Sequence, residues 1–191
     1  MKPPTPFPLA LNIGTDIVHL PRIARLLTRQ NGTYLARFTR RILHPREHAD
    51  FRARFQLSPS LVPLHVHDPQ PQAKSQPQSQ SQVQPKSQPQ PHPSSSLPPV
   101  TITPDMTRWL AGRFAAKEAA RKAAPRGAAQ LGWKEVVVRV SEVDEGRPEV
   151  VFLDGLGGDG DGQKGEGEGR VGKLSISHDG EYVVAMVLAA G

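Results

Sequence analysis

The chain has 191 residues, with 24 Lys and Arg against 18 Asp and Glu, and it contains 20 prolines, 17 glycines and no cysteine. This length suits a single domain, since domains hold roughly 100–200 residues, and the lack of cysteine excludes a disulfide scaffold, a thiolate metal site and thiol catalysis. The basic excess favours anionic partners: nucleic acid, an anionic membrane, a phosphorylated ligand or an acidic protein.

Two stretches of biased composition interrupt the chain. Residues 68–99 contain nine Gln, nine Pro and seven Ser, and residues 154–170 contain eight Gly and five Asp or Glu. Neither stretch can bury enough apolar surface to offset the entropy of ordering it, so we expect disordered insertions at 65–100 and 154–170. The rest, from residue 9 to 190, is predicted to form one domain. No apolar run approaches the roughly 18 residues of a membrane-spanning helix.

The first predicted element is a strand. Apolar residues alternate with period two at the start of residues 9–18, which predicts one buried face, and Gly14 allows a close backbone approach. Asp16 then lies near the end of the strand, where side chains commonly face a site, although it could also cap the following helix. Pro21 suits the first turn of that helix, which is expected to end near residues 31–32.

Further helices are expected on both sides of the Gln/Pro/Ser stretch. A second helix is predicted near residues 35–42, and Pro45 is expected to interrupt it before another turn or two over 46–55. The strongest helix signal covers 104–124, because Thr103 is a good capping residue and a proline and an acid follow it.

The C-terminal part is predicted to be rich in strands. Strands are expected at 133–140 and 148–153, and Asp179-Gly180 between two apolar segments is a strong hairpin signal. The whole pattern predicts an α+β fold with an antiparallel sheet and a long central helix.

The long helix carries the most informative polar residues. Phe114, Glu118 and Lys122 follow one another at i, i+4 spacing and therefore share a face. A carboxylate in such a row must meet a cation, a metal or water, because burying it unpaired is costly. One interpretation is an ion pair between Glu118 and Lys122 within the helix. Another is an oxygen-only Mg²⁺ site made by Asp16 and Glu118. Several basic residues would then suit phosphate: Arg113, Lys117, Arg121 and Lys122.

Three segments resemble one family. Residues 12–23, which begin Asn-Ile-Gly-Thr-Asp, are similar to the N-terminal signature of holo-acyl-carrier-protein synthases, the short type of 4′-phosphopantetheinyl transferase. Residues 109–123 closely match the second signature of that family, with its Phe-x-x-Lys-Glu-x-x-x-Lys core, and residues 174–188 look like its closing hairpin. The resemblance implies the 4′-phosphopantetheinyl transferase fold.

The resemblance also implies a reaction and a metal. Phosphopantetheine would pass from coenzyme A to a serine of an apo-acyl-carrier protein, releasing adenosine 3′,5′-bisphosphate. Asp16 and Glu118 would hold Mg²⁺, and Lys122 would reach a phosphate. The base that takes the serine proton is left open between Glu118 and a metal-bound water.

Substrate-binding residues are expected from the same resemblance. Arg113, Ser177 and His178 would surround the phosphates of coenzyme A, although His178 could be an ordinary hairpin residue and Lys117 a solvated helix charge. Arg22 would dock the acidic helix of the carrier protein; otherwise it belongs to the solvated face of its helix. The family usually has a Gly-Thr-Gly-like loop after the position of Lys122, and this chain does not.

Assembly, location and alternatives complete the expectations. Family members of this size form trimers, so we expect a homotrimer, and the compartment is mitochondrial or cytoplasmic, with the resemblance favouring mitochondria. Neither nucleic acid nor membrane is expected as a partner. The alternatives are a basic nucleic-acid-binding protein and a module that binds a carrier protein without modifying it. Scarce aromatic residues and no RNA-binding signature count against the first.

Overall fold

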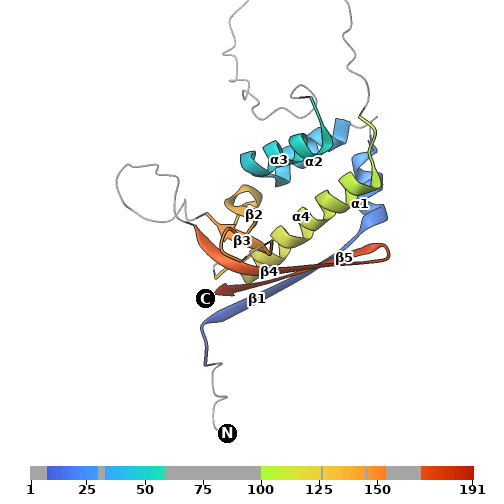
Figure 1. The fold of residues 1–191 in the computed structure, drawn as a ribbon. Coiled ribbons are helices and arrows are strands. Elements are labelled where there is room, and N and C mark those ends of the chain that lie inside the picture. Colours follow the sequence, from blue (N-terminus) through green and yellow to red (C-terminus); the bar gives the residue numbers. More distant parts are fainter. Residues whose placement is uncertain (1–7, 30–32, 59–99, 126, 145, 154–168) are drawn as a thin grey trace, which may run out of the picture.

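The computed structural model describes residues 8–29, 33–58, 100–125, 127–144, 146–153 and 169–191 (Figure 1). In this part of the chain, five strands form one antiparallel sheet in the order β1-β5-β4-β3-β2. Four α-helices accompany the sheet, and α4 lies along it, as Figure 1 shows. The predicted α+β class, with an antiparallel sheet and a long central helix, is confirmed.

The elements have the following bounds. The helices are α1 (Leu20–Leu27), α2 (Thr33–Ile42), α3 (Pro45–Phe55) and α4 (Pro104–Ala123), and a 3₁₀ turn, η2, spans Trp133–Glu135. The strands are β1 (Leu11–His19), β2 (Val136–Val140), β3 (Pro148–Phe152), β4 (Arg170–Asp179) and β5 (Tyr182–Ala190).

Helix α4 is built to lie close to the sheet. Thr103 caps it by accepting a hydrogen bond from the Met106 N–H at 3.1 Å, as the sequence predicted. Its packed side is a row of wholly buried alanines: Ala111, Ala115, Ala116, Ala119, Ala120 and Ala123. Small side chains let the helix backbone approach the strands, and α4 contacts β1 and β5 extensively.

Gly14 marks the tightest point between β1 and α4. A Cβ atom at this position would collide with the carbonyl oxygen of Ala119 and would lie 2.7 Å from the amide nitrogen of Ala123. Only a glycine therefore allows this approach without a shift of the backbone. The contact fixes which turn of α4 faces the following residues of β1.

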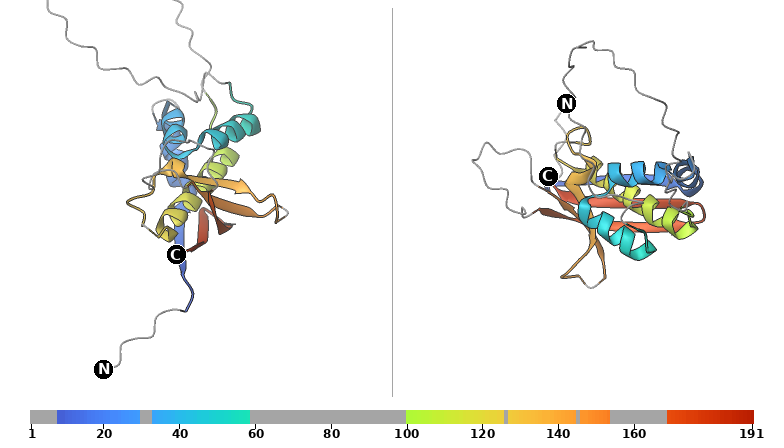
Figure 2. Two further views of the ribbon diagram at one scale, coloured as in Figure 1. Left: turned by 90° about the vertical axis from the view of Figure 1, so that its left-hand side faces the viewer. Right: turned by 90° about the horizontal axis from the view of Figure 1, so that it is seen from above.

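The sheet has one covered face and one open face. In β1 and β5 the buried residues alternate with exposed ones, and Gly14 pairs with Val187 while Asp16 pairs with Ala185 on the face that α4 covers. The other face is open and apolar, and it presents Leu11, Ile13, Ile17, Val184, Met186 and Leu188. Figure 2 shows the helices on one side of these strands from two further directions.

Several element boundaries differ from the predictions. Pro45 begins α3 instead of interrupting a helix, because His44 and Glu47 form a capping box around it, and α3 runs on to Phe55. The strand expected from residue 133 begins only at Val136, after η2. The hairpin turn is Gly180-Glu181, one residue later than expected, since Asp179 still pairs with Tyr182.

The predicted insertions fall mostly outside the described residues. Val100, at the end of the first insertion, packs against the core, and Arg170, at the end of the second, begins β4 and pairs with Phe152. None of the helices in the described ranges is long and apolar enough to cross a membrane.

Candidate active site

Asp16 faces α4 from the covered side of β1. The alternation of the strand places it there with Gly14 and Val18, and its side chain is 16% exposed. The ammonium Nζ of Lys122 lies 2.8 Å from Asp16 Oδ1 and also donates to the Thr15 carbonyl at 2.8 Å. Asp16 does not cap α1, since His19 occupies the capping position.

Glu118 lies one helical turn before Lys122 on α4. Its Oε1 accepts a hydrogen bond from Arg121 Nη1 at 3.2 Å, and its side chain is 22% exposed. The expected ion pair between Glu118 and Lys122 is therefore replaced by two others, Arg121 with Glu118 and Lys122 with Asp16. Lys122 thus pairs with Asp16 of β1, which is distant in the sequence, and not with its neighbour on α4.

Arg121 also organises the chain that follows α4. It donates to the carbonyls of Leu131 at 2.7 Å and Ala128 at 2.6 Å, and its guanidinium lies 4.9 Å from the centre of the Trp133 ring. These bonds hold the segment that follows α4, where the chain lacks the Gly-Thr-Gly-like loop of the family.

The two carboxylates can serve a hard cation that takes few protein ligands. Asp16 and Glu118 are both partly exposed, and each is already neutralised by one basic side chain. Mg²⁺ is commonly bound by one or two carboxylates, with waters and phosphates in its other positions, so this donor set fits it. Among the described residues there is no group of three or more His, Asp or Glu that could hold a metal ion.

Arg113 and His178 come together at a separate pocket. A cavity of about 240 Å³ lies between α4 and β4, and both residues line it with Trp109 and Gly112. Two further arginines line it, Arg54 and Arg108. Burial, and the charge of Arg108, lower the pKa of His178. Asp105 also lines the cavity and pairs with Arg108 at 3.3 Å, and the three arginines together can bind a ligand that carries several phosphates.

Ser177 does not share this pocket within one chain. It pairs with Val184 on the open face of the sheet, whereas its neighbour His178 pairs with Val183 on the covered face. Successive residues of a strand point to opposite sides, so the structure brings His178 but not Ser177 to Arg113.

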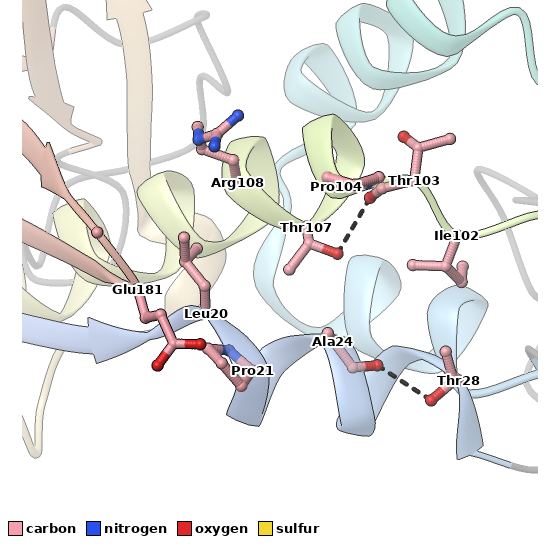
Figure 3. A pocket seen from close by; sticks show the side chains of 11 residues that line it. Leu20, Pro21, Ala24, Thr28, Ile102, Thr103, Pro104, Thr107, Arg108 and Glu181 are labelled. Carbon is pink, nitrogen blue, oxygen red and sulfur yellow. Dashed lines mark hydrogen bonds between the residues drawn. The ribbon is translucent and has the colours of Figure 1, made fainter.

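Arg22 and Arg25 are exposed on α1 and do not line this cavity, and Arg29 is exposed just after the helix. Beside α1 lies a larger cavity of about 440 Å³, shown in Figure 3. Leu20, Pro21 and Ala24 of α1 and Ile102 line it, and Arg108 borders both this cavity and the one at Arg113. Three threonines and Glu181 also line this cavity, whereas none of the three exposed arginines does.

Lys117 was expected to be solvated or near a phosphate, and both interpretations are wrong. Its side chain is wholly buried and its Nζ pairs with Glu47 of α3.

Three residues at these sites were not predicted from the sequence: Glu47, Arg54 and Arg108. Glu47 had one usable signal, since it follows Pro45 at the position where a capping box places an acid. Arg54 had none, because only the folded chain brings α3 to α4, whereas Arg108 lies on the same predicted helix as Arg113.

Comparisons with known proteins identify the family of the chain. No protein-family model matches the chain. The mitochondrial 4′-phosphopantetheinyl transferase B of Aspergillus fumigatus is 57% identical over 187 residues, which cover 97% of each chain. The holo-[acyl-carrier-protein] synthase of Ligilactobacillus salivarius is 38% identical over 81 residues, 42% of this chain and 51% of that protein.

A solved structure shows the same fold. The acyl carrier protein synthase of Plasmodium yoelii, solved with ADP bound, matches with a TM-score of 0.51 at 20% identity over 94% of both chains. The chain therefore has the fold of the acyl carrier protein synthases, a five-stranded antiparallel sheet with a long helix along it. On its identity to the Aspergillus protein, the chain belongs to the 4′-phosphopantetheinyl transferase family.

Proposed function

We propose that the protein transfers 4′-phosphopantetheine from coenzyme A to a serine of an apo-acyl-carrier protein, with Mg²⁺ bound at Asp16 and Glu118. The observation that carries this proposal is the meeting of Asp16 on β1 with Lys122 on α4, one turn from Glu118. Family membership supports the reaction class. Mg²⁺, when bound, neutralises the negative charge of the diphosphate.

The transfer proceeds by attack of the serine hydroxyl oxygen on the β-phosphorus of coenzyme A. A new phosphorus–oxygen bond to serine forms, and the bond from that phosphorus to the bridging oxygen breaks. The bridging oxygen leaves with adenosine 3′,5′-bisphosphate, and Glu118 takes the serine proton. Lys122 donates to a phosphate oxygen as charge grows on it, which is the positioning and neutralisation that phosphoryl transfer requires.

Coenzyme A binding is assigned to the basic cavity. Arg113 and His178 line it together with Arg54 and Arg108, so the cavity can take the remaining phosphates of the cofactor. The carrier protein is assigned to α1, where Arg22 is exposed and where Leu20, Pro21 and Ala24 of the same helix line a cavity. An acidic helix with a few apolar side chains would match such a surface.

The open face of the sheet supports assembly of several copies. Ile13 and Ile17 are more than 60% exposed on it, and four further large apolar residues of β1 and β5 lie beside them. Exposure of such an apolar face to water is unfavourable. We propose that another copy of the chain covers it in a homotrimer. Ser177 lies on this face, so any role it has would be at the interface between copies.

Light scattering of the purified full chain tests the assembly. A trimer mass is expected, and Ile17→Glu should shift it toward the monomer. A monomeric wild-type chain at micromolar concentration would contradict the homotrimer.

A mitochondrial location is proposed from the Aspergillus relative, which is named as mitochondrial. Fractionation of cells that express the full chain tests it. Recovery in the cytosol would favour the other compartment.

One experiment tests the activity. The full chain is incubated with coenzyme A, Mg²⁺ and an apo-acyl-carrier protein, and the carrier is weighed by mass spectrometry. A gain of about 340 Da, the mass of the transferred group, is expected. An unchanged mass, with the carrier still bound, would instead indicate a non-catalytic binding module.

A further inference from the structure

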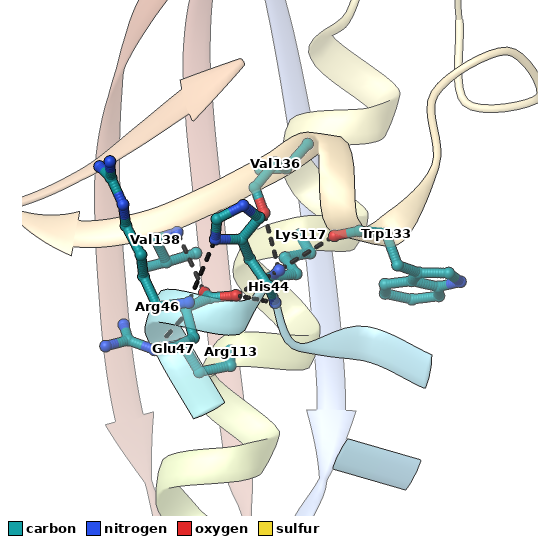
Figure 4. A network of polar contacts seen from close by, with 8 residues as sticks. All are labelled: His44, Arg46, Glu47, Arg113, Lys117, Trp133, Val136 and Val138. Carbon is teal, nitrogen blue, oxygen red and sulfur yellow. Dashed lines mark hydrogen bonds and ion pairs between the residues drawn. The ribbon is translucent and has the colours of Figure 1, made fainter. Parts of the chain in front are cut away.

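A cluster of buried charges lies where α3, α4 and β2 meet. Glu47 is 1% exposed and Lys117 is 0% exposed, and Lys117 Nζ lies 2.5 Å from Glu47 Oε2 (Figure 4). Lys117 also donates to the carbonyls of Trp133 at 2.9 Å and Val136 at 2.7 Å. All three protons of this ammonium therefore have partners, which a buried cation requires.

The Glu47 carboxylate is held as firmly as its partner. Its Oε2 accepts the backbone N–H of His44 at 2.8 Å, and its Oε1 accepts the backbone N–H of Val138 at 3.1 Å. The carboxylate is thus fixed by the start of α3, by β2 and by α4 together. Its position does not depend on the rotamer of any exposed side chain.

Arg113 connects this cluster to the basic cavity. Its Nε lies 3.9 Å from Glu47 Oε1, and its guanidinium lies 4.6 Å from the centre of the Trp109 ring, which also lines the cavity. Burial lowers the pKa of Arg113 and the nearby Glu47 opposes that effect. The guanidinium is therefore held between a fixed carboxylate and an aromatic face.

The charges of the cluster do not cancel. One carboxylate faces two cations, and Lys117 already satisfies it at the shorter distance. Among Glu47, Lys117 and Arg113 one positive charge remains, and it lies on the residue that reaches the cavity; Asp50 is a second, weaker influence that raises the pKa of Arg113. A simple Arg–Glu pair would instead have no net charge where a phosphate enters the cavity.

We propose that Glu47 is a positioning residue: with Lys117 it orients Arg113 toward a phosphate of coenzyme A without neutralising it. The inference rests on the proposed function, in which this cavity takes coenzyme A. Neither Glu47 nor Lys117 lines the cavity, so their effect on the cofactor would pass through Arg113.

Full-length variants test this role. The double substitution Glu47→Gln, Lys117→Met removes both buried charges of the pair at nearly constant volume. Single removal would leave one charge buried and unpaired, with a large loss of stability. We expect the double variant to raise the coenzyme A Kd, measured by calorimetry, and the coenzyme A KM by about tenfold, with kcat within about twofold.

Coupling to Arg113 separates positioning from general damage. Arg113→Met alone should weaken coenzyme A by a similar factor, and adding it to the double variant should cause little further loss. A matched control is Arg139→Met, Glu149→Gln, which removes another ion pair, 2.7 Å long, between β2 and β3. That variant should lower the Tm and leave the coenzyme A KM unchanged.

Several results would overturn the inference. One is a double variant that binds coenzyme A as tightly as the wild type does. Another is a triple variant whose loss of coenzyme A affinity equals the sum of the losses in the double variant and in Arg113→Met. The third is a control variant whose coenzyme A KM changes as much as that of the double variant. If circular dichroism shows that the double variant does not fold, Glu47→Asp is the second test. This substitution keeps the negative charge but moves the carboxylate away from Arg113. An unchanged coenzyme A KM in Glu47→Asp would refute the positioning role. Failure of the wild type to bind coenzyme A would instead contradict the proposed function.

Discussion

Lys122 Nζ bonds Oδ1 of Asp16 at 2.8 Å, although the two residues lie 106 positions apart in the sequence. The ion pair joins β1 to α4 at the point where Gly14 has already brought them together. Glu118, the other proposed ligand of Mg²⁺, lies one helical turn before this lysine and bonds Arg121 instead.

Replacing Asp16 by Asn removes one proposed ligand of Mg²⁺ and the charge that pairs with Lys122. We expect kcat to fall by at least about 100-fold, because the developing charge on the diphosphate is no longer neutralised. The gain in carrier mass over time measures it. Glu142→Gln, at a carboxylate 82% exposed in the β2–β3 connection, is the control and should leave kcat unchanged.

Replacing Glu118 by Gln should abolish transfer and leave α4 folded. The amide keeps a hydrogen-bond acceptor for Arg121 but cannot take a proton or bind Mg²⁺ well. The far-ultraviolet circular dichroism of the variant should match that of the wild type. Transfer at more than a few per cent of the wild-type rate would exclude Glu118 as the base.

Replacing Gly14 by Ala should destabilise the protein by about 2–4 kcal/mol, because the added methyl group collides with the backbone of α4. Urea unfolding measures the change. Gly180→Ala is the matched control: its φ of 50° is unfavourable for alanine, but nothing lies within 4 Å of the added atom. Its cost should be only about 1 kcal/mol. Equal costs would show that the close approach is not real.

Stability should fall as the pH is lowered from 6.5 to 4, partly because of His48. Burial lowers the pKa of His48 from 6.5 to about 4, so in this window the unfolded chain binds a proton that the folded chain does not. Above pH 6.5 His48 is neutral in both states and does not lower the free energy of unfolding. As the pH approaches 4, protonation of the unfolded chain at His48 lowers that free energy by about 3 kcal/mol.

His48→Gln provides the test for that prediction. Urea unfolding of both proteins at several pH values should give a smaller slope for the variant between pH 6.5 and 4. Parallel curves for variant and wild type would contradict the assignment to His48.

Reversing the charge of Arg22 by substitution with Glu should raise the KM of the carrier protein at least about tenfold and leave the KM of coenzyme A nearly unchanged. The reason is that Arg22 is exposed on α1 and does not line the basic cavity. Arg41→Glu on α2 is the control with the same change of charge. Equal changes in both Michaelis constants would exclude α1 as the docking helix.

Much of the fold could be predicted from local patterns. The cap at Thr103 and the alternation in β1 and β5 are properties of neighbouring residues, so they identified α4, the first strand and the closing hairpin. Pro45 misled the prediction because its effect depends on whether it begins a helix, and the capping box with Glu47 decides that.

The candidate site was predicted less completely, because its partners come from distant segments. Helical spacing placed Glu118 and Lys122 on one face but could not show that Asp16 would take the lysine. Lys117 looked solvated for the same reason, since only the tertiary structure brings Glu47 to it. Strand alternation alone could have separated Ser177 from His178.

The pairing of β1 with β5 has a consequence for when the protein becomes active. β1 lies at the edge of the sheet and pairs only with β5 among the described strands, so Asp16 is held in place by residues 182–190. Contacts between such distant segments form late, since a long loop must close first. A nascent chain on the ribosome therefore carries both carboxylates but no assembled site. We therefore expect the site at Asp16 to assemble only when residues 182–190 have paired with β1.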